Sequence, residues 1–327
     1  MRYRTAALAL LTAALITGVT LCAESWAQTK RQRVGILTSF DPVTEKQWLE
    51  PFRRTLAEQG WIEGQNVTFE YRGVSGDPSQ LGEAAAELVQ LKVDVIFAVG
   101  ASFVRAAHAA TRSIPIVAGD YTTDPVAEGY IESYGRPGGN LTGVFLDAPE
   151  FAGKWIQLLK AVVPKLSRAA VLWDPTPGRA HLHAVQQIAR SSGIRLQVLE
   201  LHEPKDIELA FSAFRGHPQA LIILPSPMMY RQSDQLAKLS LKQGLPATSM
   251  ARKFAEAGGA ISYGPDMAST LERNALFVAK ILSGAKPGEL PIERPTTVQL
   301  IVNLKTTKAL GLTVPESVLY RADELIR

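Results

Sequence analysis

Short apolar runs alternate with helical patterns along most of this chain. Runs rich in branched and aromatic residues, such as RVGILTSF (33–40) and VDVIFAVG (93–100), are separated by segments whose apolar residues recur every three to four positions. Such alternation is typical of βαβ units, which build parallel sheets covered by helices on both faces. The uninterrupted apolar character of 93–100 and of ALIILPS (220–226) fits strands buried on both sides.

The alternation occurs twice. The first series predicts strands at 33–40, 66–71, 93–100 and 114–120, with helices at 44–59, 77–90 and 102–111. The second predicts strands at 169–174, 195–201, 220–226, 246–250 and 260–264, with helices at 179–192, 204–215 and 230–243. Two successive series predict an α/β protein with two doubly wound parallel-sheet lobes.

The elements that follow the second series exceed what one lobe needs. They are a helix at 266–283, a strand-like segment at 297–302 and a helix near 305–310. We therefore expect the chain to cross between lobes three times, in the glycine-rich stretch 136–145, near 263–265 and near 296–297. This predicts lobe 1 at 33–145 plus 265–296 and lobe 2 at 146–264 plus 297–327, with hinge residues Gly143, Tyr263, Gly264 and Thr297.

Residues 1–27 have the pattern of a secretory signal peptide. Arg2 and Arg4 precede an apolar stretch of about 16 residues, shorter than the ~20 that span a membrane, and Ser25-Trp26-Ala27 resembles a cleavage site. An uncleaved anchor and lipidation at Cys22 are the alternatives, although Leu21 stands where lipoprotein signals carry a small residue. We expect an exported, periplasmic protein.

Composition excludes several classes of protein. With 46% hydrophobic and 20% charged residues, the chain is neither disordered nor low-complexity. One cysteine rules out a disulfide scaffold or a thiolate metal cluster. The net charge of +4 is not gathered in any stretch, so no nucleic-acid partner is indicated.

Local signatures of catalysis and of cofactor binding are absent. No glycine-rich dinucleotide motif follows the first strand, and neither a P-loop nor a G-x-S-x-G elbow occurs. His181 and His183 would point to different faces of one helix, so we expect solvated surface histidines and no metal site. The sequence predicts no cofactor and no enzyme; an enzyme would have to use Asp41, Asp124 or Asp174.

The residues that follow the predicted strands offer the chemistry of a ligand site. Ligands of open parallel sheets bind outside the carboxyl ends of the strands, where helix N-termini favour anions. The hydroxyls, carboxylates and aromatic rings there suit a zwitterion with an apolar side chain, and also a polyol or a small amide. Serines there can instead act as helix caps, and Asp124-Pro125 and Asp174-Pro175 as turns, whereas the Tyr121 ring should cover something and Trp173 should be core. The candidate ligand-binding residues are Ser39, Phe40, Asp41, Ala101, Ser102, Tyr121, Thr122, Asp124, Asp174, Thr176, Ser226 and Met228.

Five sequence blocks resemble, in order, those of the tryptophan/tyrosine-type substrate-binding proteins of ABC transporters. They are IPIVAGDYTTDPVAEGYIESYGRPGGNLTGV (114–144), AVLWDP (170–175), ALIILPSPMM (220–229), AGGAISYGPD (257–266) and VNLKTTKALGLTVPESVLYRADELI (302–326). The resemblance implies a type I periplasmic binding protein fold with a three-segment hinge, closing over a small ligand. It also implies aromatic amino acids as ligands, ABC permease subunits as partners and a monomeric receptor.

The chain departs from the family at two points beside the expected site. Asp174-Pro175 stands where the family commonly has Asn-Pro, and a carboxylate there favours a ligand with an ammonium group or several hydroxyls. Residues 121–123 are longer and more polar than the usual block. A transport receptor is the leading hypothesis. The alternatives are a sensory subunit that docks on a membrane kinase and an exported hydrolase or isomerase.

Overall fold

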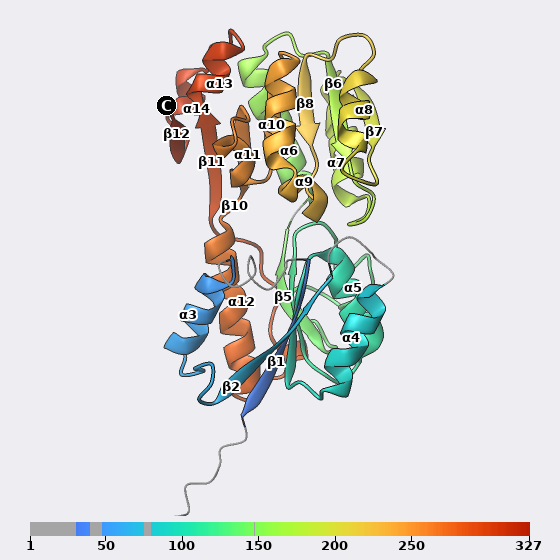
Figure 1. The fold of residues 1–327 in the computed structure, drawn as a ribbon, viewed down its shortest axis with the longest axis vertical. Coiled ribbons are helices and arrows are strands. Elements are labelled where there is room, and N and C mark those ends of the chain that lie inside the picture. Colours follow the sequence, from blue (N-terminus) through green and yellow to red (C-terminus); the bar gives the residue numbers. More distant parts are fainter. Residues whose placement is uncertain (1–30, 40–47, 75–79, 147) are drawn as a thin grey trace, which may run out of the picture.

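Two α/β lobes are stacked along the long axis of the molecule in a computed structural model (Figure 1). The structure describes residues 31–39, 48–74, 80–146 and 148–327. The predicted signal peptide, Phe40, Asp41 and the predicted helix starts at 44 and 77 lie outside these residues.

Lobe 1 contains a five-stranded sheet in which every pair of neighbours is parallel, in the order β2-β1-β3-β4-β5. Its strands are β1 (Gln32–Thr38), β2 (Val67–Gly73), β3 (Val95–Val99), β4 (Ile116–Asp120) and β5 (Leu141–Phe145). One face packs on α3 (Glu50–Glu58) and α12 (Met267–Leu282), the other on α4 (Leu81–Gln90) and α5 (Ala101–Ala110). The sheet is thus covered by helices on both faces, as the sequence predicts.

Lobe 2 contains a seven-stranded sheet in the order β12-β11-β10-β9-β8-β6-β7. Its strands are β6 (Arg168–Trp173), β7 (Arg195–Glu200), β8 (Ala220–Ile223), β9 (Ala247–Ser249), β10 (Ile261–Pro265), β11 (Val298–Asn303) and β12 (Glu324–Ile326). Its helices are α6 (Ala148–Val162), α7 (Ala180–Ser191), α8 (Asp206–Ser212), α9 (Pro227–Arg231), α10 (Ser233–Lys242), α11 (Arg252–Glu256), α13 (Leu304–Ala309) and α14 (Glu316–Leu319). A short 3₁₀ helix, η2 (Pro287–Glu289), precedes β11.

One strand pair of lobe 2 departs from the predicted parallel sheet. β10 and β11 are antiparallel, with Pro265 opposite Val298. Between them the chain runs through α12, which packs on β3, β4 and β5 of lobe 1. The chain leaves lobe 2 at the end of β10 and returns into the neighbouring strand, so the two strands necessarily run in opposite directions (Figure 1).

The first connection between lobes falls later than the glycine-rich stretch 136–145. Residues 141–145 form β5, which pairs with β4 inside the lobe 1 sheet. The chain enters lobe 2 after Phe145, and Leu146 already packs in the lobe 2 core with Phe151 and Trp155.

Candidate functional site

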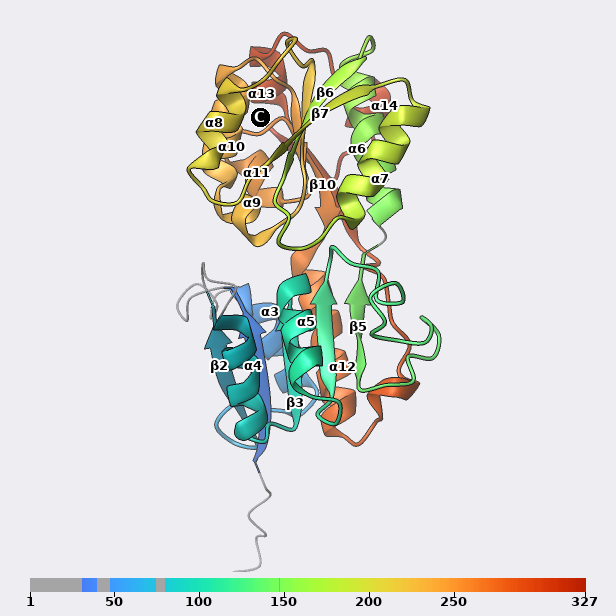
Figure 2. The same ribbon diagram turned by 90° about the vertical axis from the view of Figure 1, so that its right-hand side faces the viewer.

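The carboxyl edges of the two sheets face each other across the lobes (Figure 2). The Ser102 hydroxyl, in the first turn of α5 after β3, donates to the Thr176 carbonyl after β6, at 3.3 Å. His181 Nε2 lies 2.7 Å from the carbonyl oxygen of Tyr121, which follows β4. We refer to the loops that follow β3, β4 and β6, with Ser102, Tyr121 and Thr176, as the interlobe site.

The turn from β3 into α5 places Ser102 toward lobe 2. Gly100 precedes the helix with a φ of 97°, a left-handed conformation that favours glycine. Its N–H donates to the Gly119 carbonyl of β4, which fixes the turn against the sheet. The helix carries no side-chain cap. Its first N–H groups can therefore act on an anionic group of a ligand, whereas the single proton of the Ser102 hydroxyl is donated to the Thr176 carbonyl.

Tyr121 belongs to lobe 1 by sequence but packs in the hydrophobic core of lobe 2. Its side chain is buried with Leu146 and Trp155. Its hydroxyl lies near Gly119 and Asn274 of α12, since a Cβ added at Gly119 would lie 3.1 Å from the hydroxyl oxygen and 3.4 Å from Asn274 Nδ2. The Tyr121 side chain therefore contacts both lobes, with its ring in the lobe 2 core and its hydroxyl beside β4 and α12 of lobe 1. Its role as a ligand contact stays a prediction. Burial raises the pKa of the Tyr121 hydroxyl, with the Asp120 charge adding to the rise.

Asp120, absent from the sequence candidates, organises the loop after β4. The carboxylate is fully buried and accepts hydrogen bonds from the Thr122 N–H (2.9 Å), the Thr122 hydroxyl (3.0 Å), the Thr123 N–H (3.2 Å) and the Thr123 hydroxyl. Burial raises the pKa of Asp120, while these hydrogen bonds act to lower it. The candidate Thr122 therefore has its hydroxyl committed to Asp120. An aspartate followed two and three residues later by threonines was the available sequence signal.

Asp124 builds a turn. Its side chain is exposed and accepts from the N–H groups of Val126 (3.0 Å) and Ala127 (3.4 Å) and from the Tyr134 hydroxyl (3.4 Å). Asp124 therefore acts as a turn residue, which is the alternative to ligand contact that the sequence leaves open for Asp124-Pro125.

Asp174 combines a turn with a buried charge beside an arginine. It is 5% exposed and accepts from the Thr176 N–H at 2.9 Å. Burial lowers the pKa of Arg231, on α9, and the negative charge of Asp174 opposes that change, so the two groups interact. A ligand ammonium at Asp174 would thus share the carboxylate with Arg231. The preceding Trp173 is core, as predicted, with its indole N–H donating to the Gly178 carbonyl.

The remaining ligand candidates divide between structural and uncommitted positions. Ser226 caps α9, accepting from the Met229 N–H at 3.1 Å, and Met228 is buried in the core between α9 and the sheet. Ala101 is the buried first residue of α5, and Ser39 is partly exposed just beyond β1.

The predicted hinge residues occupy different environments. The Tyr263 carbonyl accepts from the Trp155 indole N–H at 2.8 Å, and a Cβ at Gly264 would lie 2.1 Å from the Met250 carbonyl oxygen. The exposed Thr297 accepts from the Asp266 N–H at 3.0 Å, which joins the two strand connections. Gly143 lies within β5. Their role as hinges stays a prediction.

The expectation that the histidines are solvated is wrong for His181. It is 4% exposed, its ring centroid lies 5.6 Å from that of Trp155, and burial lowers its pKa to about 4. A carbonyl can only accept, so the neutral ring carries its proton on Nε2 and donates to Tyr121. His181 stands four and eight positions before Val185 and Ala189, both buried on the same face of α7, and this spacing was the available signal.

Neither a metal-binding cluster nor a membrane-spanning helix occurs within the described residues. No group of three or more histidine, cysteine, aspartate or glutamate side chains in 31–39, 48–74, 80–146 and 148–327 is placed to hold a metal ion. Within the same ranges, no helix is long and apolar enough to cross a membrane.

Comparisons with known proteins agree with this architecture. A curated tyrosine-binding protein of Clostridioides difficile is 21% identical over 86% of this chain and 82% of its own length. An ABC domain in complex with L-Trp from Streptococcus pneumonia superposes with a TM-score of 0.83 at 21% identity, covering 91% of this chain and all of that one. A ligand-free, open substrate-binding protein with adhesive properties from Clostridium difficile gives 0.65 at 21% identity, covering 90% and 98%.

The predicted fold class, two α/β lobes of the type I periplasmic binding arrangement, is confirmed. The family model for ABC transporter substrate-binding proteins matches residues 39–326, nearly the whole described chain. This chain therefore belongs to the ABC transporter substrate-binding protein family.

Proposed function

We propose that this protein is the periplasmic receptor of an ABC importer. It binds an amino acid with an aromatic side chain at the interlobe site, delivers it to permease subunits and catalyses no reaction. The observation that carries the proposal is the meeting of both carboxyl edges at Ser102, Tyr121 and Thr176 in a chain of this family. The names of the relatives, a tyrosine-binding protein and a structure with L-Trp, support the aromatic class.

The polar groups at the interlobe site suit a zwitterion. The uncapped N-terminus of α5 favours a carboxylate, because helix N–H groups and the helix dipole both attract negative charge. The Asp174 carboxylate, with Arg231 close by, offers an acceptor for an ammonium group. Neither lobe carries both features, so a zwitterion would contact the two lobes together.

Closure of the lobes is the expected response to the ligand. A ligand that contacts both lobes favours the closed arrangement by the difference in its affinity for the two states. Rotation would occur about the connection after β5 and the paired connections at Asp266 and Thr297.

The proposed ligand class is tested by thermal and denaturant unfolding of the purified protein with single amino acids. A ligand at 100 times its Kd is expected to stabilise the folded state by about 2.7 kcal/mol, because it binds only the folded protein. L-tyrosine, L-tryptophan or L-phenylalanine should produce the shift, with glutamine and a polyol as comparison compounds. If only the comparison compounds stabilise the protein, the aromatic assignment is wrong, and if no compound does at millimolar concentration, the receptor proposal is contradicted.

Ser102→Ala is expected to weaken ligand binding about fivefold. The substitution removes a hydroxyl that bridges the lobes, and a hydrogen bond of this kind contributes about 1 kcal/mol. Calorimetric titration with the amino acid that stabilises the protein measures the effect. Ser191→Ala, at an exposed serine of α7, is the matched control and should leave the Kd unchanged. Equal affinities for the two variants would remove Ser102 from the site.

A further inference from the structure

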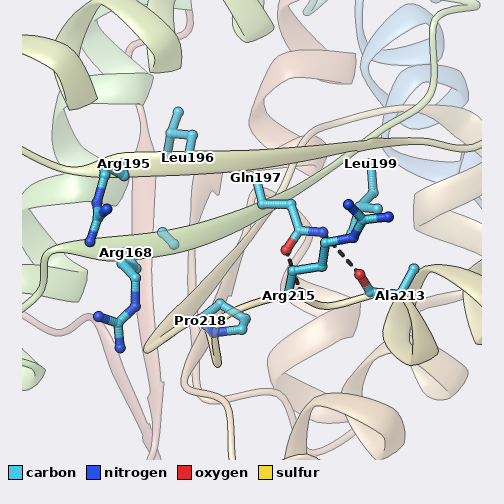
Figure 3. Close-up of a pocket in the computed structure, with 9 residues that line it drawn as sticks. Arg168, Arg195, Leu196, Gln197, Leu199, Ala213, Arg215 and Pro218 are labelled. Atoms are coloured by element: carbon cyan, nitrogen blue, oxygen red, sulfur yellow. Dashed lines mark hydrogen bonds between the residues drawn. The ribbon is translucent and has the colours of Figure 1, made fainter.

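A pocket lies at the amino ends of β6 and β7 in lobe 2, and its lining is shown in Figure 3. The interlobe site lies at the opposite, carboxyl edge of the same sheet. It has a volume of about 530 Å³ and is lined by Arg168, Ala169, Arg195, Leu196, Gln197, Leu199, Ala213, Arg215 and Pro218. Arg168 begins β6, whereas Asp174 and Thr176 follow its carboxyl end. Because strands rise about 3.3 Å per residue, the two sites are separated by about 20 Å along β6.

Helix α8 has seven residues and ends at Ser212. The loop that follows it contributes Ala213, Arg215 and Pro218 to the pocket, beside the first residues of β6 and of the edge strand β7. The loop after α8 is held in place by Gln197, whose amide donates to the Ala213 carbonyl at 3.0 Å and accepts from the Arg215 N–H at 2.9 Å. Both hydrogen bonds are drawn in Figure 3, and they fix one wall of the pocket against β7.

The polar part of the lining is strongly cationic. Arg168 and Arg195 stand directly opposite each other on adjacent strands, at a separation of about 5 Å between strands. Like charges at such positions are unfavourable unless an anion lies between them. Arg168 Nε is buried without a hydrogen-bond partner, and no ion pair within the described residues involves any of the three arginines.

The three arginines are arranged at two ends of the pocket. Arg168 and Arg195 lie beside each other at one end, and Arg215 extends along the other, with Gln197 between (Figure 3). Leu199 and Pro218 supply apolar surface beside these arginines. A ligand that fits this lining carries an oxyanion together with an organic part.

We propose that this pocket binds the phosphate group of an organic phosphate. Two adjacent guanidinium groups can share one phosphate, which has more acceptor oxygens and more negative charge than a single carboxylate, and Arg forms bidentate contacts with it. Arg168 and Arg195 hold the phosphate, while Arg215 and the apolar side chains contact the organic part. The same chemistry is offered by a soluble phosphate ester and by a phospholipid headgroup. Because the pocket lies far from the interlobe site, either can bind while an amino acid is bound.

The test uses one soluble probe and one membrane probe. Glycerol 3-phosphate is titrated calorimetrically into the purified protein, and co-sedimentation is measured with phosphatidylglycerol vesicles against phosphatidylcholine vesicles. Binding of glycerol 3-phosphate alone identifies a soluble ester as the ligand, and binding of phosphatidylglycerol vesicles alone identifies a lipid headgroup. Failure of both probes to bind the wild-type protein would overturn the proposal.

Arg195→Gln assigns the binding to the pocket. It is expected to weaken binding of the effective probe about tenfold, because a charge-assisted hydrogen bond to the phosphate is lost. Arg190→Gln, at an exposed arginine of α7 in the same lobe, is the matched control and should change binding less than twofold. Arg195 is itself exposed, so its variant should fold normally, and the combined Arg168→Gln/Arg195→Gln variant should abolish binding. Equal loss in the Arg195 and Arg190 variants would show a diffuse charge effect and overturn the proposal, whatever the combined variant does.

Discussion

Replacing Gly143 by alanine is expected to destabilise the folded protein by about 3 kcal/mol or more. Gly143 is the third residue of β5 and has a φ of 135°. A Cβ at this position would lie 2.1 Å from the Ala118 carbonyl oxygen and 2.6 Å from its backbone nitrogen. The close approach of β4 and the unusual backbone conformation each exclude a side chain.

The strand cannot move aside to accommodate the methyl group. On one side it pairs with β4, and on the other the Phe145 N–H donates to the Glu293 carbonyl at 2.9 Å while the Glu293 N–H donates to the Gly143 carbonyl at 3.0 Å. Urea unfolding of Gly143→Ala measures the loss. Gly153→Ala is the control, because its added Cβ would meet nothing within 4 Å in the middle of α6, where alanine is favoured over glycine by about 1 kcal/mol.

The outcome also tests the hinge prediction for this residue. A hinge role alone would leave the unfolding midpoint near that of the wild type and alter only the response to ligand. A packing role lowers the midpoint strongly with or without ligand. Equal midpoints for Gly143→Ala and wild type would contradict the packing role.

The local patterns of the sequence predict the order of elements well. The run 93–100 contains β3 and the run 220–226 contains β8, because strands buried between two helix layers must be apolar throughout. The predicted elements do not include helix α6, although Phe151, Trp155, Ile156 and Leu159 recur at helical spacing and are buried. The antiparallel β10–β11 pair depends on a tertiary path through lobe 1, which no local pattern encodes.

Some roles of the candidate site residues can likewise be predicted from the local sequence, and others cannot. Ser226 as a cap and Asp124 and Asp174 as turn residues follow from local chemistry, since their acceptors bond N–H groups two or three residues ahead. The contacts that join the lobes do not follow from local chemistry. Ser102 and Thr176 are 74 positions apart and His181 and Tyr121 are 60 apart, so only the relative placement of two lobes brings them together. Sequence reasoning could therefore predict which edge of each sheet carries the candidate residues, but not which of them contact each other across the lobes.

The histidine between the lobes makes the stability of the protein depend on pH. His181 is expected to remove about 3 kcal/mol of folding free energy as the pH falls from 6.5 to below 4. Its pKa is about 4 in the folded protein and 6.5 in the unfolded chain, so the unfolded chain takes up a proton first as the pH falls. Above pH 6.5 the ring is neutral in both states, and the full folding free energy is present. Between pH 6.5 and about pH 4 only the unfolded chain is protonated, so the folding free energy falls by about 1.4 kcal/mol per pH unit.

Burial explains the size of this effect. Nδ1 is buried with no partner and Nε2 already donates to Tyr121, so a second proton would place a charge among Trp155, Tyr121 and the lobe 2 core. Two other groups have shifted pKa values that also affect stability in acid. Burial lowers the pKa of His108, which adds a loss of the same sign, and raises that of Asp120, which acts in the opposite direction by favouring the folded state in acid.

His181→Gln isolates the contribution of this residue. The glutamine amide can still donate to the Tyr121 carbonyl but takes up no proton, so the fall in stability between pH 6.5 and pH 4 should be smaller than in wild type by about 3 kcal/mol. Urea unfolding at intervals of half a pH unit measures both proteins. His183→Gln, at an exposed histidine of the same helix, should retain the wild-type pH dependence. If His181→Gln follows the same curve as His183→Gln, carboxylates rather than the interlobe histidine cause the acid destabilisation.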